Sequence, residues 1–264
     1  MRLNIDVSLD YALSNPADIL LMVEVARDFA GQRVASDMLT TTPDIADPSG
    51  DGRRIPGPTA LGTRLWLRGE GSFGARYRAE VEVTRPDPDL AALCATAPHD
   101  LPGETTDCLM PSRYCPSDLF EPFVLSEFPG LSGGALARAM SGWVGDHLSY
   151  VPGASDASTT AADTFLTRRG ICRDYAHVLI AMARAGGIPA RMAAVYAPGV
   201  EPPDFHAVAE LWLGDAWHLA DATGMARPSE IAVIGVGRDA AEVAFLTSYG
   251  AMELRAQSVR VVRA

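Results

Sequence analysis

Gly170-Ile171-Cys172-Arg173-Asp174-Tyr175-Ala176-His177 opens a helical pattern in this chain of 264 residues. Apolar residues recur from there at three- and four-residue intervals, as they do on one face of a helix: Ile171, Tyr175, Val178, Leu179, Met182 and Ala185. Gly186-Gly187, followed by Pro189, ends the pattern. The sequence therefore predicts a helix over residues 172–185 that begins at a cysteine.

Cys172 has the sequence surroundings of a nucleophile. A thiolate is the reactive form of cysteine, and the first turn of a helix favours this anion through unpaired backbone N–H groups and the positive end of the helix dipole. Gly170 can adopt a strained conformation and let a substrate backbone approach closely. The backbone N–H of Cys172 is also a natural donor to an oxyanion. The competing interpretation is a buried structural cysteine, which is the commoner role beside apolar residues.

A hairpin downstream supplies the partners that such a nucleophile needs. A two-residue turn at Leu213-Gly214-Asp215-Ala216 places Asp221 opposite Val208 and therefore on the same sheet face as His206. Such diagonal neighbours lie about 7–8 Å apart at Cα, which an imidazole and a carboxylate can span. Asp221 would then orient His206, and His206 would pair with the Cys172 thiolate. A three-residue loop would put the two side chains on opposite faces.

Each of these residues also has a plainer interpretation. A single histidine at the start of a strand more often lies at the surface or in a satisfied core than in a catalytic site. Asp221 precedes Ala222-Thr223-Gly224 and could cap a turn. The other histidines are weaker bases: His177 faces another side of the helix, His218 points to the opposite sheet face, and His99 and His147 have no supporting context.

The first part of the chain has the pattern of a β domain. Apolar and polar residues alternate over 3–10, residues 19–25 form a buried apolar run, and residues 64–68 and 75–83 have the pattern of two more strands. The proline- and glycine-rich stretch 43–58 is expected to be a long loop. We predict a small antiparallel β-sandwich over about residues 1–85, a junction near residue 100, and hence two domains at 1–100 and 101–264.

The second part has the pattern of helices followed by strands. An apolar stripe predicts a helix between Gly134 and Tyr150, and a capping-box pattern at Thr160-Ala161-Ala162-Asp163 starts a short helix that ends at Gly170. Strands are expected over 191–197, 206–213 and 216–222. Helices followed by a run of strands indicate an α+β fold.

Composition excludes several function classes. The net charge is −11 and no run of Lys and Arg occurs, which argues against nucleic-acid binding. No stretch is long enough to span a membrane, and Met1–Val7 has no apolar signal region, so we expect a cytoplasmic protein without a membrane partner. The four cysteines are then reduced thiols. Cys94, Cys108 and Cys115 lack metal-ligand spacing, and neither a metal nor a cofactor is expected.

The segments that carry Cys172, His206 and Asp221 resemble those of the transglutaminase-like superfamily. The resemblance is to bacterial transglutaminase-like proteins in particular, which are often described as cysteine proteases. The resemblance runs over residues 160–224 and covers most of the chain when two outlying segments are added. The matching segments are Asp163–Asp174, Ile188–Arg191, Pro203–Ala207, Trp217–Thr223, Pro111–Cys115 and Ile234–Ala241.

The resemblance implies a papain-like α+β core, with a helix-borne cysteine packed on an antiparallel sheet, preceded by an N-terminal β domain. It implies that Cys172 is the nucleophile, His206 the general acid and base, and Asp221 its orienter. A second oxyanion donor lies upstream of the cysteine in the family and matches Tyr150 here. Acidic calcium loops of the animal members have no counterpart, and Gly235-Val236-Gly237-Arg238 is better interpreted as a loop bordering the cleft than as a nucleotide site.

Three functions fit these residues. The leading one is a cysteine-dependent amide hydrolase, a peptidase or isopeptidase, that acts on a protein or peptide through a Cys172 thioester. The second is a transamidase, in which an amine resolves the same acyl-enzyme; whether the cleft excludes water decides between them. The third is a non-catalytic binding or scaffold protein of the same fold, because fold alone does not imply function.

Overall fold

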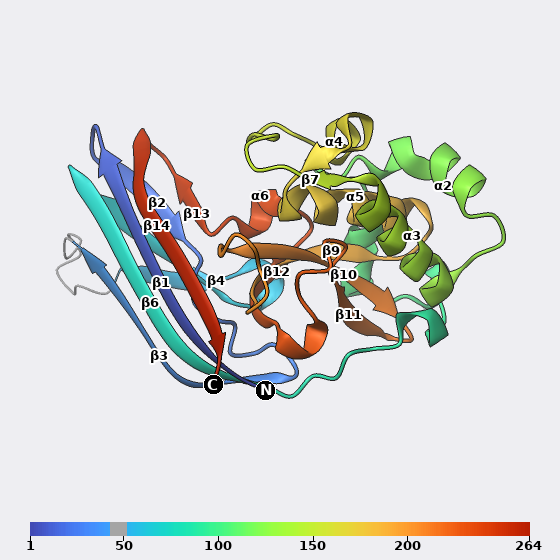
Figure 1. The fold of residues 1–264 in the computed structure, drawn as a ribbon, viewed down its shortest axis with the longest axis horizontal. Helices are drawn as coiled ribbons and strands as arrows, with labels where there is room; N and C mark the ends of the chain where they lie inside the picture. The colour runs from blue at the N-terminus through green and yellow to red at the C-terminus, as the bar shows by residue number, and fades with distance from the viewer. Residues whose placement is uncertain (43–51) are drawn as a thin grey trace.

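The computed structural model describes residues 1–42 and 52–264 of the chain. It has a β-sandwich on one side and a helical core built on a third sheet on the other (Figure 1). The strands are β1 (Arg2–Leu13), β2 (Ala17–Leu21), β3 (Gln32–Thr42), β4 (Arg53–Pro56), β5 (Thr63–Gly69), β6 (Ser72–Val83), β7 (Ser149–Tyr150), β8 (Arg169–Gly170), β9 (Ala190–Tyr196), β10 (His206–Leu213), β11 (Ala216–Ala220), β12 (Ala232–Gly237), β13 (Leu246–Ser248) and β14 (Met252–Arg263). The α-helices are α1 (Gly103–Thr106), α2 (Glu121–Glu127), α3 (Gly133–His147), α4 (Ala161–Thr167), α5 (Cys172–Ala185) and α6 (Ala240–Val243). The α+β prediction is confirmed.

Two four-stranded sheets form the sandwich. Their strand orders are β14-β1-β6-β3 and β13-β2-β5-β4, and every pair is antiparallel. The alternation predicted for the first strand is present, because the odd-numbered apolar residues Leu3, Ile5, Val7 and Leu9 are buried. The inward-facing side chains of the two sheets meet in one apolar core.

The third sheet carries the helical core. Its order is β11-β10-β9-β12, again antiparallel, and α5 packs across β10 and β9. Val178, Leu179 and Met182 of α5 are fully buried in a cluster that also holds Leu211 of β10 and Met140 of α3. α5 has the bounds that its apolar pattern predicts, because a helix buried on so many sides is specified along its whole length.

Several segments differ from their predicted structure. Residues 53–56 of the expected loop form β4, which pairs with β5, while residues 43–51 of that loop lie outside the described residues. The second strand is shorter than its apolar run and ends at Leu21. Gly235-Val236-Gly237 is not in a loop: it lies in the fully buried strand β12, which pairs with β9. A buried sheet strand tolerates such glycines where other chain segments approach closely.

The last strands of the chain belong to the sandwich. β14 pairs with β1 over almost its full length, and β13 pairs with β2 (Figure 1). The predicted split at residue 100 assigned residues 246–263 to the second domain, so strand pairing adds them to the first. The sequence did not show this pairing. β14 is mostly exposed, so its weak apolar pattern does not indicate which strand it pairs with.

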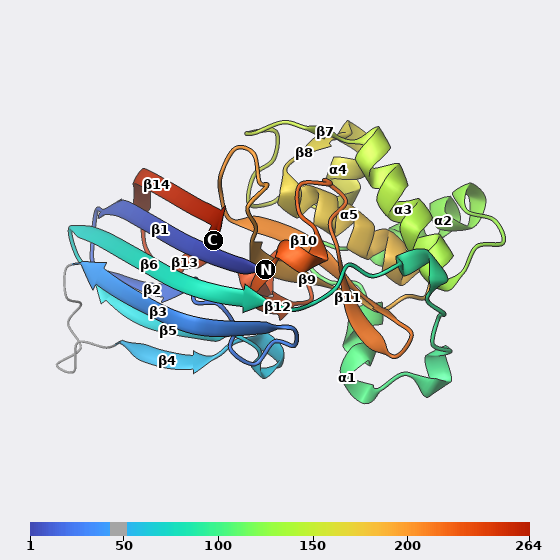
Figure 2. The ribbon, with the colours of Figure 1, turned by 60° about the horizontal axis from the view of Figure 1, so that its bottom comes forward.

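Buried hydrogen bonds connect the sandwich to the third sheet. The Gln32 side chain donates to the carbonyls of Ala26 and Val233, at 2.6 and 2.9 Å, and accepts from the Val233 N–H at 2.8 Å. The hydroxyl of Tyr196 donates to the Val23 carbonyl at 2.7 Å. These buried hydrogen bonds fix the orientation of the two parts, whose separation is seen from another side in Figure 2.

Candidate active site

Cys172 is the first residue of α5 and is 7% exposed. Ile171 precedes the helix in an extended conformation, and Asp174 accepts a hydrogen bond from the Ile171 N–H at 2.8 Å. This acidic residue in the first turn satisfies one of the backbone donors that a helix start leaves free. The predicted nucleophile therefore lies at the positive end of a long, buried helix.

Tyr150 lies against Cys172. A short parallel pair, β7–β8, sets Tyr150 beside Gly170, and the Val151 N–H donates to the Gly170 carbonyl at 2.9 Å. Burial and the adjacent Cys172 thiol raise the pKa of Tyr150 to about 12. Tyr150 is therefore a neighbour of Cys172 at the start of α5.

His206 and Asp221 are in direct contact. The predicted two-residue turn is present, with Leu213 paired to Ala216, and His206 Nε2 lies 2.9 Å from Asp221 Oδ2. Asp221 also accepts from the Thr223 N–H and hydroxyl at 2.9 and 2.7 Å, and from the Ala226 N–H at 2.8 Å. The residue therefore does both things that its sequence context allowed: it caps the turn and it holds the histidine.

The environment of His206 favours an imidazolium. Burial alone would lower the pKa of His206, but the hydrogen bond with the Asp221 carboxylate and the nearby Cys172 thiol raise it to about 10. Burial raises the pKa of Asp221, but the hydrogen bond and charge of His206 together with the hydrogen bonds from Thr223 outweigh burial and lower it. The Nδ1 atom of His206 is buried and has no hydrogen-bond partner among the residues described. With Nε2 held by Asp221, Nδ1 is the nitrogen that remains for Cys172.

Gly170 is beside the site for a different reason from the predicted one. Its φ is not positive, and a Cβ atom added here would lie 2.6 Å from Cβ of Asp174 and 2.8 Å from its Oδ2. The room that this glycine leaves is thus occupied by the side chain of Asp174. Close packing behind the helix start, rather than backbone strain, explains why a glycine stands at this position.

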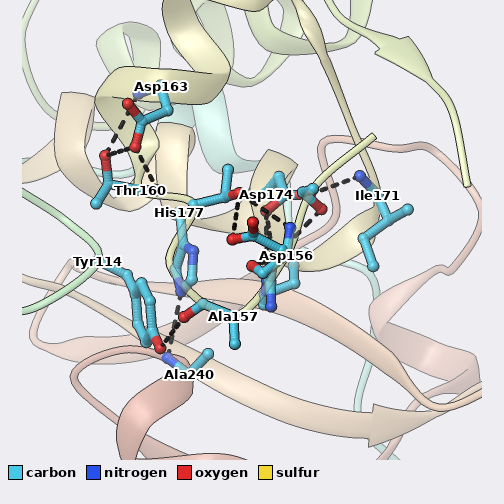
Figure 3. Close-up of polar contacts among 12 residues, drawn as sticks. Tyr114, Asp156, Ala157, Thr160, Asp163, Ile171, Asp174, His177 and Ala240 are labelled. Atoms are coloured by element: carbon cyan, nitrogen blue, oxygen red, sulfur yellow. Dashed lines mark hydrogen bonds and ion pairs between the residues drawn. The ribbon is translucent and has the colours of Figure 1, made fainter. Parts of the chain in front are cut away.

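Asp174 anchors the loop that follows β7 (Figure 3). Its carboxylate, fully buried, accepts from the Ser155 hydroxyl at 2.5 Å and from two guanidinium nitrogens of Arg173 at 3.1 and 3.3 Å. Arg173 in turn donates to the Asp156 carbonyl at 2.8 Å. This network was missed from the sequence, although an acidic residue three positions into a predicted helix is a recognised capping signal.

His177 belongs to a second buried cluster, which also holds Tyr114 and Ala240 (Figure 3). Its ring stacks on Tyr114, with centroids 5.1 Å apart, and its Nε2 accepts from the Ala240 N–H at 3.2 Å. Burial lowers the pKa of His177 to about 3, against the nearby Asp239 carboxylate, which raises it. Asp239 accepts from the Tyr114 N–H at 2.9 Å. The two outlying segments of the family resemblance, 111–115 and 234–241, therefore meet at this histidine.

The remaining candidates lie elsewhere. His218 hydrogen-bonds the Leu213 carbonyl at 3.1 Å and His147 stacks on Trp143. Cys94 is exposed, whereas Cys108 and Cys115 are buried. Within residues 1–42 and 52–264, no group of three or more His, Cys, Asp or Glu is arranged to hold a metal ion. In that same part of the chain no helix is long and apolar enough to cross a membrane.

Comparison with known proteins supports the family resemblance and the fold. Residues 131–222, which hold Cys172, His206 and Asp221, match the family described as the transglutaminase-like superfamily. A solved structure of a proposed cysteine protease from Cytophaga hutchinsonii is similar to the whole chain: it superposes with a TM-score of 0.92 at 29% identity, covering 99% of this chain and 90% of that one.

Two other matches cover less or fit less closely. An uncharacterized protein of Mycobacterium leprae is 30% identical over 115 residues, and the match covers 40% of this chain and 41% of that relative's length. The periplasmic domain of TgpA from Pseudomonas aeruginosa superposes with a TM-score of only 0.39 at 20% identity, covering 83% of this chain and 77% of that one.

Proposed function

We propose, from the premise that the chain carries a domain of the transglutaminase-like superfamily at residues 131–222, that it is a cysteine-dependent amide hydrolase acting on proteins or peptides. Cys172 is its nucleophile, His206 its general acid and base, and Asp221 the residue that orients His206. The similar Cytophaga hutchinsonii structure, itself a proposed cysteine protease, supports hydrolysis as the reaction. A cytoplasmic location belongs to the same proposal.

The first half-reaction forms a thioester. The Cys172 thiolate attacks the carbonyl carbon of the amide, and the negative charge that develops on the carbonyl oxygen is met by the Cys172 backbone N–H and the Tyr150 hydroxyl. The C–N bond then breaks, and the His206 imidazolium gives its proton to the departing amine. Asp221 keeps the ring in position and stabilises its positive charge before that transfer.

The second half-reaction releases the acid. His206, now neutral, removes a proton from water, and the hydroxide attacks the thioester carbon; the C–S bond breaks and Cys172 leaves as a thiolate beside the restored imidazolium. An amine in place of that water would make the same chemistry a transamidation. The observation that carries the proposal is the buried His206, held through Nε2 at 2.9 Å by Asp221, with its pKa raised by that carboxylate and by the Cys172 thiol.

Alkylation of Cys172 with iodoacetamide, followed by peptide-resolved mass spectrometry between pH 5 and 9, tests the ion pair. Cys94, exposed in the same molecule, is an internal reference thiol. If His206 stabilises a thiolate, Cys172 reacts faster than Cys94 at the acidic end despite its burial, and this advantage disappears in His206→Ala. Equal pH profiles for the two cysteines in the wild type would contradict the proposal and favour a binding protein.

A second assay separates the functions. Wild type and Cys172→Ser are incubated with a mixed peptide substrate, with and without a fluorescent primary amine, and the products are identified by mass spectrometry. New carboxyl termini or lost side-chain amides that require Cys172 indicate hydrolysis. Incorporation of the amine that requires Cys172 indicates transamidation. Peptide binding that is unchanged in Cys172→Ser, without any product, indicates the scaffold function.

A further inference from the structure

A second cleft lies where the sandwich meets the third sheet. Its volume is about 570 Å³, within the range of small-molecule sites, and junctions between domains are a common place for such sites. The loop 28–31 and the linker segment 84–88 form one wall, and β9, β10 and β11 form the other. None of Cys172, His206, Asp221 and Tyr150 lines it.

A buried ion pair stands on the sheet wall. Arg191 and Glu210 are directly opposite each other on β9 and β10, and Nε of Arg191 donates to Oε2 of Glu210 at 2.6 Å. Their side chains are only 8% and 1% exposed. Leu211, the next residue along β10, packs in the cluster around α5, so Glu210 faces the opposite side of the sheet, toward the cleft.

The rest of the Arg191 guanidinium is held in place by an aromatic ring, but its terminal nitrogens make no hydrogen bond within the described residues. It lies over the ring of Trp217, 4.0 Å from the ring centroid. Its two terminal nitrogens donate no hydrogen bond to any residue that the structure describes, although the whole residue is 7% exposed. Parallel terminal N–H groups of this kind match the two oxygens of a carboxylate. A buried arginine with free donors facing a cleft is therefore preorganised for an anion.

A second arginine also lines the cleft. Arg85 lies across from the pair, donates to the Pro228 carbonyl at 2.8 Å, and has its guanidinium 5.1 Å from the centroid of the Phe29 ring. Burial raises the pKa of Glu210, whereas Arg191 and Arg85 both lower it, so both cations act on this one carboxylate. The lining holds two arginines and two acidic residues; Glu210 is buried and paired with Arg191, whereas Asp28 is exposed.

We propose that this cleft binds a small organic acid with an apolar body. The carboxylate accepts two hydrogen bonds from the terminal nitrogens of Arg191, and the body packs on apolar side chains between the two walls. These apolar lining residues are Phe29, Leu61, Pro86, Pro88, Trp217 and Leu219. The site is separate from the proposed chemistry at Cys172, and it holds whether or not the chain is a hydrolase.

Isothermal titration calorimetry with the full chain tests the site, with 3-phenylpropionate as the probe. The matched neutral probe is 3-phenylpropionamide, and inorganic phosphate is the probe for a bare anion. We expect the acid to bind at least about tenfold more tightly than either, because only the acid offers both a carboxylate and an apolar body. Equal binding of the acid and its amide, equal binding of phosphate, or no binding of the acid would overturn the proposal.

Variants locate the binding. Arg191→Gln combined with Glu210→Gln removes both members of the ion pair, and it should weaken acid binding about tenfold or more. Arg33→Gln with Glu82→Gln makes the same charge change at an exposed pair and should leave binding unchanged. Cys172→Ser should also bind normally. Retained binding in the folded Arg191 and Glu210 double variant would place the probe elsewhere and contradict the proposal.

Discussion

His206 Nε2 lies 2.9 Å from Asp221 Oδ2, so the ring is held from one side, and its buried Nδ1 has no hydrogen-bond partner among the described residues. Asp221 can hold the ring because its position is itself fixed by Thr223 and by the Ala226 N–H. The hairpin register brings the two residues within reach, and the turn after β11 fixes the carboxylate. The contact therefore depends on local chain geometry, which is why the sequence could predict it.

The pH dependence of stability should show this contact. The pKa of His206 rises from 6.5 to about 10 on folding, so its stabilising contribution is complete below pH 6.5 and is lost as pH rises through about 10. The lowered pKa of Asp221 keeps the partner ionised down to below 3.8. We expect the difference in free energy of unfolding between wild type and His206→Gln, from urea denaturation, to be largest near pH 6 and to shrink toward pH 10. A difference that stays constant over that range would contradict the contact.

Gly170→Ala should destabilise the protein although alanine is the smallest change available. The added Cβ would lie 2.6 Å from Cβ of the buried Asp174, so the helix start must shift, and we expect a loss of about 1–3 kcal/mol. Gly142→Ala in α3 is the matched control, because nothing lies within 4 Å of a Cβ there and the change should stabilise by about 0.5–1 kcal/mol. Chemical denaturation measures both. Two effects of the same sign would show that Gly170 is not constrained by packing.

Asp174→Ala should destabilise the protein strongly, although Asp174 is not part of the proposed triad. It leaves the Ile171 N–H, the Ser155 hydroxyl and Arg173 without their buried acceptor, and we expect a loss of about 3 kcal/mol. The loop between β7 and α4 should also become accessible to limited proteolysis. Thr160→Ala, which removes the cap of the short helix α4, should cost about 1 kcal/mol and leave that loop protected. Equal costs for the two variants would contradict the anchoring role.

His177 should contribute to the loss of stability in acid. The pKa of His177 falls from 6.5 to about 3 on folding, so between these values the unfolded chain binds a proton that the folded chain does not bind. The free energy of unfolding therefore falls as pH drops from 6.5 toward 3. One such group contributes a slope of up to about 1.4 kcal/mol per pH unit. His177→Phe keeps a ring against Tyr114 and should flatten the acid slope, whereas His99→Gln, at an exposed site, should not. An unchanged slope in His177→Phe would exclude this contribution.

Local patterns predicted the helix of Cys172 and the hairpin of His206 and Asp221, because helix periodicity and turn length act over a few residues. They did not predict β14, which contacts β1 from the other end of the chain and is exposed over most of its length. They also missed the anchor between Ser155 and Asp174, since a loop residue and a helix residue meet only in the folded chain. The sequence thus did not predict contacts between distant segments, because a single sequence specifies such contacts weakly.

The pairing of β14 with β1 has a consequence for synthesis of the protein on the ribosome. β1 is translated before β14 and pairs with β6, but its other edge stays open until residues 252–263 have left the exit tunnel. During that interval the whole transglutaminase-like core is made and an unpaired strand edge is exposed beside it. Closing the sandwich is therefore a late, long-range step, and nascent chains stalled before residue 252 present an edge that chaperones or other nascent chains can pair with.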